Sequence, residues 1–493
     1  MLIWCPDTGT IEPPGEQTQI FTCQNFFPTN RHGYAKCGGG ATTSYTTAAA
    51  NVVLGSAMLI DSSGTPRLFV GSQKKIQEAN GSGGWTDRSN ATTYSATDIW
   101  CFAAFGDDMI ATSKNDPMQV SSGAASFSDL AGSPPKAKFV IVQSNVVLAF
   151  NINDGTDRPD WWASSDQNDP RTWTAASTNY ADKDRLYGGI GGAITAAATW
   201  QEQAIVFKKS AMYRGRFTGD TDQPWVWDFI STKFGCPAPF GHIETEAGLV
   251  FVTERDFMLY DGSPPVSIAD AVRKTLMADI GTHGSTVFCT VDEPNNCVYF
   301  WYLESDSTVS GSPHEADNIA IWNYKTGKWG SQDSFGGNLV LPTSGVRGVN
   351  YTNFTSSAIA GGTNGGKIAN LVFGGEGKLY NMTGGGVFAG SQDSITSALV
   401  FWEQGDSARD MELARIRTVF NLTSGIPSAA TAQSQAYPQS FGTPTVNNAT
   451  MTADKVFDFH ARGRYFSNTI TISGTNYGEI LRILPEYIQS GRR

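Results

Sequence analysis

Charged residues, clustered cations and long apolar runs are scarce in this sequence, and each scarcity excludes a class of protein. Asp, Glu, Lys and Arg together make up 16% of the 493 residues, below the usual quarter. No run of Lys or Arg exceeds a pair, which argues against a surface that grips nucleic acid through its phosphates. No run of 18 apolar residues occurs, so we expect no membrane span or anchor. The first residues also lack the basic start and apolar stretch of a signal peptide.

Motifs that carry chemistry are scarce as well. The seven cysteines are odd in number and include no C-x-x-C pair, so neither a disulfide framework nor a zinc site is indicated. Cys101 and Cys289 lie in apolar, strand-like runs, where we expect small core residues. The five histidines are isolated, and no phosphate-binding glycine loop is present. The sequence therefore predicts no catalytic residues, no cofactor and no metal site, and it favours synthesis in a reducing cytoplasm.

What the sequence does contain is typical of a β protein. It is rich in glycine (53 residues) and in aromatic residues (12%). A short apolar run, a few turn residues and a second apolar run recur along the chain, with spacings of 41, 37, 58, 45, 49 and 73 residues between starts at Leu68, Met109, Val146, Ala204, Leu249, Val298 and Leu371. Hairpins repeated about every 40–50 residues are typical of propeller blades. We therefore predict an all-β chain with a β-propeller of six to eight uneven blades.

Large aromatic residues follow several of these hairpins. We expect them to pack between neighbouring sheets, where they bury the most area; they are Trp85, Phe127, Trp173, Trp225, Trp227 and Trp329. The one helical pattern lies at 268–281, where Ile268, Val272 and Leu276 share a face. We predict a short helix there that packs on the rim of the propeller.

The two ends of the chain do not follow the repeat. Residues 1–50 predict an irregular N-terminal arm, residues 51–395 the propeller, and residues 396–493 a C-terminal β-sheet unit. A Ser-, Ala-, Thr- and Gln-rich segment at 424–450 is predicted as a flexible surface loop. The arm and the terminal unit are our candidates for contacts between subunits.

A propeller glycosidase of the sialidase type is the alternative interpretation. Such enzymes repeat the Asp-box S-x-D-x-G-x-x-W at hairpin turns, and the segment 164–173 comes near it. However, Asn168 replaces the glycine, Trp173 is displaced by two residues, and the motif occurs once. A glycan-binding or glycan-cleaving propeller for host recognition would use Trp161, Trp162 and Trp173 as stacking platforms. The simpler interpretation of these rings is packing between blades.

The order of several segments resembles a known family. These are NFFPTNRHGYAKCGGG, FGDDMIATSKNDPMQV, WWASSDQNDPRTW, AIVFKKSAMYRGRF, FGCPAPFGHIETEAGLVFVTERDFMLYDG, NIAIWNYKTGKW and a terminal ARGRYFSNTITI with GRR. Together they resemble the tail nozzle or hub proteins of short-tailed bacteriophages, also called packaged-DNA stabilisation proteins. The likeness extends from about residue 20 to the end of the chain.

The resemblance implies a structural virion protein of the phage tail rather than an enzyme. It implies a homo-oligomeric ring of six copies below the portal and its adaptor (head-to-tail connector) protein. The ring would extend the DNA channel, help to retain packaged DNA until ejection and dock tail fibres or spikes. DNA would pass through the lumen without sequence recognition, which suits a chain with a formal charge of −11. A six-fold ring needs heterologous, head-to-tail contacts that close.

Overall fold

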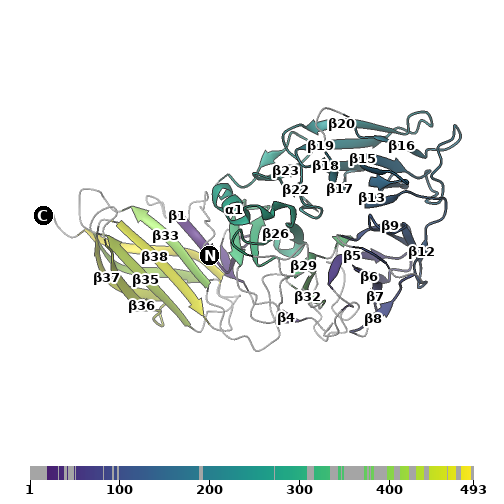
Figure 1. Ribbon diagram of the computed structural model, residues 1–493. Coiled ribbons are helices and arrows are strands. Elements are labelled where there is room, and N and C mark those ends of the chain that lie inside the picture. Colours follow the sequence, from purple (N-terminus) through teal and green to yellow (C-terminus); the bar gives the residue numbers. More distant parts are fainter. Residues whose placement is uncertain are drawn as a thin grey trace.

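The computed structural model shows an all-β chain in which a β-propeller adjoins a β-sandwich (Figure 1). None of the helices in the described ranges has the length and hydropathy that a membrane span requires. The structure describes residues 19–31, 33–37, 41–42, 49, 52–80, 83–90, 94–96, 99–187, 192–270, 272–307, 316–332, 342–345, 347–348, 371–374, 377, 379–381, 397–404, 411–420, 429–437, 443–463, 465–473 and 479–489.

The described residues form seven propeller blades of antiparallel strands. Six of them run in chain order from the innermost strand outward, whereas the seventh takes its outermost strand from the N-terminal segment. Blades 1 to 4 consist of β5 (Val53–Ile60), β6 (Pro66–Ser72), β7 (Ile76–Ala79) and β8 (Trp85–Asp87); β9 (Cys101–Phe105), β10 (Asp108–Thr112), β11 (Gln119–Ser122) and β12 (Ser128–Asp129); β13 (Lys136–Gln143), β14 (Val146–Asn153), β15 (Asp157–Ser164) and β16 (Asp182–Arg185); and β17 (Ile194–Trp200), β18 (Gln203–Lys208), β19 (Ala211–Phe217) and β20 (Trp225–Ser231).

The remaining blades are less regular. Blades 5 to 7 consist of β21 (His242–Thr245), β22 (Gly248–Val252), β23 (Phe257–Tyr260) and β24 (Val266–Ser267); β25 (Phe288–Asp292), β26 (Cys297–Tyr302), β27 (Asn318–Asn323) and β28 (Trp329–Gln332); and β29 (Pro342–Gly345), β31 (Leu371–Gly374), β32 (Leu379–Asn381) and β4 (Ala41–Thr42). The predicted six to eight blades are therefore seven.

The N-terminal segment closes the ring of blades. β4 precedes the whole propeller in sequence but pairs with β32 as the outermost strand of blade 7. On the inner side β29 lies beside β5, and β30 (Arg347–Gly348) pairs in parallel with β5. Two strands therefore join blade 7 to blade 1. β4, which precedes blade 1 in the chain, pairs at the outer edge of blade 7, and β30, which follows the first strand of blade 7, pairs with the innermost strand of blade 1.

Local sequence explains the tight hairpins. The two-residue turns Ser144-Asn145 and Gln201-Glu202 have positive φ at both positions, the geometry that matches the twist of flanking antiparallel strands. The second strands of blades 5 and 6 are the most apolar examples: every residue of β22 and of β26 is buried. A central strand of a blade is covered on both faces by neighbouring blades, so alternation with polar residues is lost.

Aromatic side chains pack between blades as expected. Trp227 of blade 4 meets Phe150 and Trp162 of blade 3 at ring-centroid distances of 5.9 and 5.5 Å. Trp85 of blade 1 meets Phe373 of blade 7 at 5.8 Å. Such pairs add stabilisation beyond the area that they bury.

The C-terminal unit is a β-sandwich that borrows strands from the N-terminal arm. One sheet has the order β1-β33-β38-β35-β36, and the other has the order β2-β3-β39-β34-β37. Their bounds are β1 (Gln19–Gln24), β2 (Phe26–Pro28), β3 (Tyr34–Lys36), β33 (Ser397–Gln404), β34 (Met411–Phe420), β35 (Ala429–Tyr437), β36 (Thr445–Thr450), β37 (Val456–Gly463), β38 (Tyr465–Ser473) and β39 (Glu479–Gln489).

Two expectations for the chain ends are corrected by this sandwich. The segment 424–450 was predicted as a flexible loop, but its described part contains β35 and β36, which pair with each other. The arm was predicted to be irregular, but its described part supplies β1 to β4 to sheets of the same chain. Those strands are therefore already paired within the chain.

The sandwich and the propeller share one continuous sheet. β2 pairs with β28, the outermost strand of blade 6, through Phe26 opposite Ser331. Asn323 Nδ2 donates to Asn30 Oδ1 at 3.0 Å and to the Pro28 carbonyl at 3.3 Å. Phe26 is fully buried in a core that extends from blades 4 to 6 into the sandwich. The two units therefore form one rigid body at this junction.

The helical pattern at 268–281 gives a shorter helix than predicted. α1 spans Arg273–Ile280, and β24 ends just before it. Leu276 and Ile280 are buried against the core. Two short 3₁₀ helices, His283–Ser285 and Glu293–Asn295, flank β25. Cys289 is buried as expected, whereas Cys101 is only half-buried.

Candidate functional site

The turns of the blades gather at the two ends of the propeller. In each blade the turns between strands 1 and 2 and between strands 3 and 4 lie at one end. The turn between strands 2 and 3 and the connection to the next blade lie at the other end. Ion pairs between neighbouring blades follow this rule: Lys325 pairs with Glu246 at 3.0 Å at the first end, and Lys209 pairs with Glu254 at 2.7 Å at the second.

The first end carries an excess of carboxylates, and we call it the acidic end. The described turns there hold ten carboxylates against three cations, of which one is buried. The carboxylates are Asp61, Asp107, Asp166, Asp169, Glu202, Asp220, Asp222, Glu246, Asp261 and Glu293, and the cations are Arg171, Lys325 and Lys328. A large part of the negative charge of the chain is thus concentrated on one surface.

Several of these carboxylates also build their own turns. Asp61 Oδ1 accepts the Ser63 hydroxyl at 2.5 Å and the Thr65 N–H at 2.8 Å. The Ser63 hydrogen bond, with that from Thr65, lowers the pKa of Asp61. The Thr172 hydroxyl likewise lowers the pKa of Asp169. Because hydrogen bonds favour the charged form, these groups stay ionised at neutral pH.

The opposite end, which we call the mixed end, is balanced in charge and contains a basic cavity. The cavity has a volume of about 670 Å³ and lies between the turns of blades 4 and 5. We call it the socket; it is lined by Lys209, Ser210, Lys233, Phe234, Gly235, Thr253, Glu254, Arg255, Asp256 and Arg273. It is within the usual size range of ligand sites.

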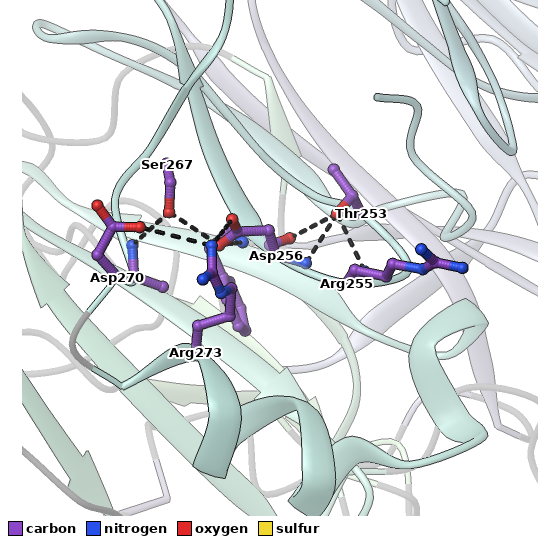
Figure 2. A network of polar contacts seen from close by, with 8 residues as sticks. Thr253, Arg255, Asp256, Ser267, Asp270 and Arg273 are labelled. Carbon is purple, nitrogen blue, oxygen red and sulfur yellow. Dashed lines mark hydrogen bonds and ion pairs between the residues drawn. The ribbon is translucent and has the colours of Figure 1, made fainter. Parts of the chain in front are cut away.

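Asp256 holds one wall of the socket in place (Figure 2). Its Oδ1 accepts the Phe257 N–H at 2.8 Å and the Ser267 hydroxyl at 3.0 Å, and its Oδ2 pairs with Arg273 at 3.0 Å. The Asp256 carboxylate is thus fully occupied and neutralises Arg273, which also approaches Asp270 at 3.5 Å. On the opposite wall Glu254 neutralises Lys209.

Two cations of the socket remain without an acidic partner in the described part of the chain: the exposed side chains of Lys233 and Arg255. Thr253 Oγ1 accepts the N–H groups of Arg255 and Asp256 at 3.1 and 2.8 Å, which fixes the hairpin tip. Figure 2 shows the Arg255 guanidinium extending away from the Asp256 network. The socket therefore presents a net positive surface.

A glycine brings the walls of the socket together. A Cβ at Gly235 would lie 2.0 Å from the Lys208 carbonyl and 2.6 Å from the Ala211 nitrogen. Only glycine allows this close approach of two backbones. The contact sets Lys233, two residues earlier, beside the turn that carries Lys209.

The channel along the propeller axis is narrow. A cavity of about 220 Å³ lies among the innermost strands and is lined mostly by small and apolar residues, among them Ser56, Ala57, Cys101, Ala198 and Ile243. Glu244 also lines it, and desolvation raises the pKa of that carboxyl.

The three tryptophans of the glycan alternative serve the blades. Trp162 is 3% exposed and packs against blade 4. The Arg158 guanidinium lies over the Trp161 ring at 4.2 Å. Trp173 donates its indole N–H to the Pro170 carbonyl at 2.8 Å. The structure does not bring these rings together on an open surface.

The Asp-box-like segment is a structural turn. Asp166 Oδ1 accepts the N–H groups of Gln167 and Tyr180 at 2.8 and 2.9 Å, which joins the two ends of the connection between β15 and β16. Within the described ranges no group of three or more His, Cys, Asp or Glu side chains is placed to hold a metal ion.

The sequence did not point to the socket. Its lining residues come from four separate segments, and only the Lys208-Lys209 pair was noticeable as a motif. Lys208 itself is buried and donates to the Leu186 carbonyl at 3.2 Å, so the pair contributes a single cation to the surface. The cavity arises from the meeting of two neighbouring blades.

Comparison with known proteins supports the fold alone. No family model matches the chain, and no curated protein matches it. Among solved structures it is similar to YCF48 bound to D1 peptide (10% identity, 68% of this chain and 92% of that one, TM-score 0.39). It is also similar to the WD40 β-propeller domain of Doa1 (10%, 69% and 96%, TM-score 0.38) and to BamB from Moraxella catarrhalis (10%, 73% and 96%, TM-score 0.39). At these scores the propeller assignment rests on the seven sheets themselves.

Proposed function

We propose that this chain is a structural protein of a phage tail: a nozzle that assembles as a ring, extends the DNA channel below the portal and adaptor, helps to retain packaged DNA, and docks tail fibres or spikes. In this role it is a scaffold and not an enzyme, and its place is the virion. The number of copies expected from the family resemblance is six.

The observation that carries the proposal is the polarity of the propeller. One end concentrates ten carboxylates, and the other end is balanced in charge and holds a basic cavity. A closed ring of identical chains needs heterologous contacts, in which two different surfaces of one chain fit each other. An acidic end and an end that holds a net positive socket meet that requirement, because attraction between carboxylates and socket favours head-to-tail contact over contact between two acidic ends.

The junction between propeller and sandwich supports a load-resisting platform. Blade 6 and the sandwich share a nine-stranded sheet, and a single apolar core extends across both. Contacts made on one unit can therefore be passed to the other through the shared sheet and core. Two modules joined in this way suit a part that must hold adaptor and fibres in fixed relation.

The charge of the chain supports passage of DNA without adhesion. A surface rich in carboxylates repels phosphates, whereas binding would need clustered Lys and Arg. The cavity among the innermost strands, about 220 Å³, is far too small for DNA, so in this proposal DNA passes through a lumen between the copies. The propeller would then form part of the wall.

Imaging of the assembly tests the proposal. We expect the purified chain, alone or mixed with the adaptor encoded beside it, to give closed rings in negative-stain micrographs and a matching mass by light scattering. Tails assembled without the chain should gain it when it is added. A chain that stays monomeric with the adaptor present and never joins such tails would refute the nozzle.

A further inference from the structure

We infer that the socket binds the loop 218–223 of a second copy of this chain, through contact of two aspartates with two cations. This inference rests on the proposed ring and names the surfaces that would make its head-to-tail contact. The loop joins β19 to β20 in blade 4, and its aspartates are Asp220 and Asp222. The cations are Lys233 and Arg255.

The socket requires an anionic occupant. Four cations line it, and the acidic residues that line it already serve two of them: Glu254 pairs with Lys209, and Asp256 pairs with Arg273. Lys233 and Arg255 are exposed and have no acidic partner in the described part of the chain. Their shared cavity of about 670 Å³ is large enough for a short peptide turn. The surplus of positive charge therefore favours a segment with about two carboxylates.

The socket does not suit a nucleic acid or a sugar. Single-stranded nucleic acid is bound by grooves that combine tracking cations with exposed aromatic platforms. The one aromatic residue of the socket, Phe234, is half-buried and packs against the core. The cations are confined to one cavity and do not continue as a stripe. A compact acidic turn of a protein fits this arrangement best.

The loop 218–223 is the acidic segment best placed to enter a socket. β19 and β20 are seven residues long each, whereas the outermost strands of blades 1, 2 and 5 have two or three residues. At about 3.3 Å per residue, this hairpin carries its loop to the rim of the acidic end. Asp220 is exposed and accepts only the N–H of Asp222, and Asp222 is exposed with no ion pair among the described residues.

Several other carboxylates of the acidic end already hold partners, and the exposed Glu202 stands alone in a two-residue turn. Asp61 accepts the Thr65 N–H within its own turn, and Asp107 of blade 2 accepts the Ser62 N–H of the same turn in blade 1. Asp166 holds its own connection, and Glu246 is paired with Lys325. Breaking those contacts would offset what a new ion pair contributes. The two aspartates of the loop can form new ion pairs without losing an existing ion pair.

The loop and the socket cannot meet within one chain. The loop lies at the acidic end, between strands 3 and 4 of its blade, and the socket lies at the mixed end. The height of the blades separates them. Contact therefore needs two copies in head-to-tail order, which is the heterologous arrangement that forms rings when the rotation closes.

Exchange of charges tests the inference. We would measure self-association by sedimentation velocity for the wild type, for the socket variant Lys233→Glu/Arg255→Glu, for the loop variant Asp220→Lys/Asp222→Lys, and for the chain with all four changes. The matched control is Lys74→Glu, compared with Lys233→Glu alone: each replaces an exposed lysine that has no ion pair among the described residues, and Lys74 lies in a turn of blade 1 at the same end. All these side chains are on the surface, and thermal unfolding verifies that each variant is folded.

The socket variant and the loop variant should each weaken self-association by about tenfold or more, and the control should change it by less than about twofold. The chain with all four changes should recover to within about threefold of the wild type, because the charges then attract again. Raising the salt from 0.05 to about 0.5 M should weaken the wild type, because added salt screens exposed charges.

Failure of this inference can be told apart from failure of the nozzle. Three results would overturn the loop-and-socket contact. The socket variant could self-associate like the wild type, the chain with all four changes could fail to recover, or the wild type could never self-associate. Rings that form regardless of these charges would leave the nozzle standing without it. Head-to-tail chains that never close into rings would support the contact and refute the nozzle. Loss of tail binding alone, with self-association unchanged, would mean that an acidic segment of another protein occupies the socket, and it too would overturn the inference.

Discussion

Substitution of Gly330 by alanine should separate the sandwich from the propeller. Gly330 lies in β28, at the single place where the strand pairs with β2. A Cβ there would lie 2.3 Å from the Phe26 carbonyl oxygen, whereas ordinary contact begins at 3.4 Å. β2 must therefore move away by about 1 Å, which a close-packed core resists at a cost of about 1–3 kcal/mol. Phe26 opposite Ser331 is the only registered pair between the two strands in the described residues. When it opens, the nearby side-chain hydrogen bonds from Asn323 to Asn30 and to the Pro28 carbonyl remain, but no other ladder pair of β2 and β28 does.

Calorimetry measures this effect. A loss of about 2 kcal/mol lowers the unfolding temperature of a unit of about 150–250 residues by roughly 4–8 °C. We expect the transition that includes the sandwich to move down by that amount and to separate from the propeller transition. Protease cleavage between β2 and β3 should become faster, because these strands lose their partner.

Gly284 provides the matched control. It has ordinary backbone geometry, and a Cβ built on it meets nothing within 4 Å. Gly284→Ala should therefore leave the unfolding temperature within about 1 °C of the wild type. If Gly330→Ala unfolds like Gly284→Ala, with a single unshifted transition, the junction is not the close contact described above and the platform argument loses its support.

Three further predictions concern single buried groups. Asn468 is fully buried and neither side-chain atom has a hydrogen-bond partner in the structure, so Asn468→Leu should raise the free energy of unfolding by about 1–2 kcal/mol in urea titration. Burial, with the neighbouring Glu304, raises the pKa of Asp279 to about 6; the folded chain then holds the proton more tightly than the unfolded one, stability falls as the pH rises from about 4 to about 6, and Asp279→Asn should add about 2 kcal/mol at pH 8 but nothing at pH 4. Trp162→Ala should cost about 3 kcal/mol, whereas Tyr187→Ala, which removes a ring that is 67% exposed, should cost less than about 0.5 kcal/mol.

The propeller could be predicted from the sequence because each hairpin has a local sequence pattern. Apolar runs such as β22 alternate along the chain with turn residues such as Ser144-Asn145, and the spacing of these hairpins repeats. The packing role of Trp227 and Trp85 also followed from repetition, because a large ring at a constant place in a blade has neighbouring sheets on both sides. These signals depend on residues close together in sequence.

The sandwich was harder to predict because its strands lack a strong apolar signal. β35 buries Ala430, Ala432, Ser434 and Ala436, whereas the residues between them are exposed or half-buried. Alternation of alanine and serine with polar residues has the composition of a linker, although its period of two is that of a strand. The small side chains suit a strand that packs closely on the opposite sheet. The pairing of β1 to β4 with strands hundreds of residues away has no local signature at all.

The charge polarity of the propeller was beyond sequence reasoning for a different reason. Asp61, Asp107, Glu202, Asp220 and Glu246 are separated by 18 to 95 residues, and none belongs to an acidic run. They meet because each follows the first or the third strand of its blade, and all seven blades point the same way around the axis. A carboxylate placed after the second strand would lie at the opposite end. The end at which a turn residue lies thus depends on whether it follows an odd or an even strand of its blade. Once the strand order of the blades is known, every turn residue can be assigned to one end. By that rule loop 218–223 and the socket of the same chain fall on opposite ends, which is why the contact proposed above requires a second copy.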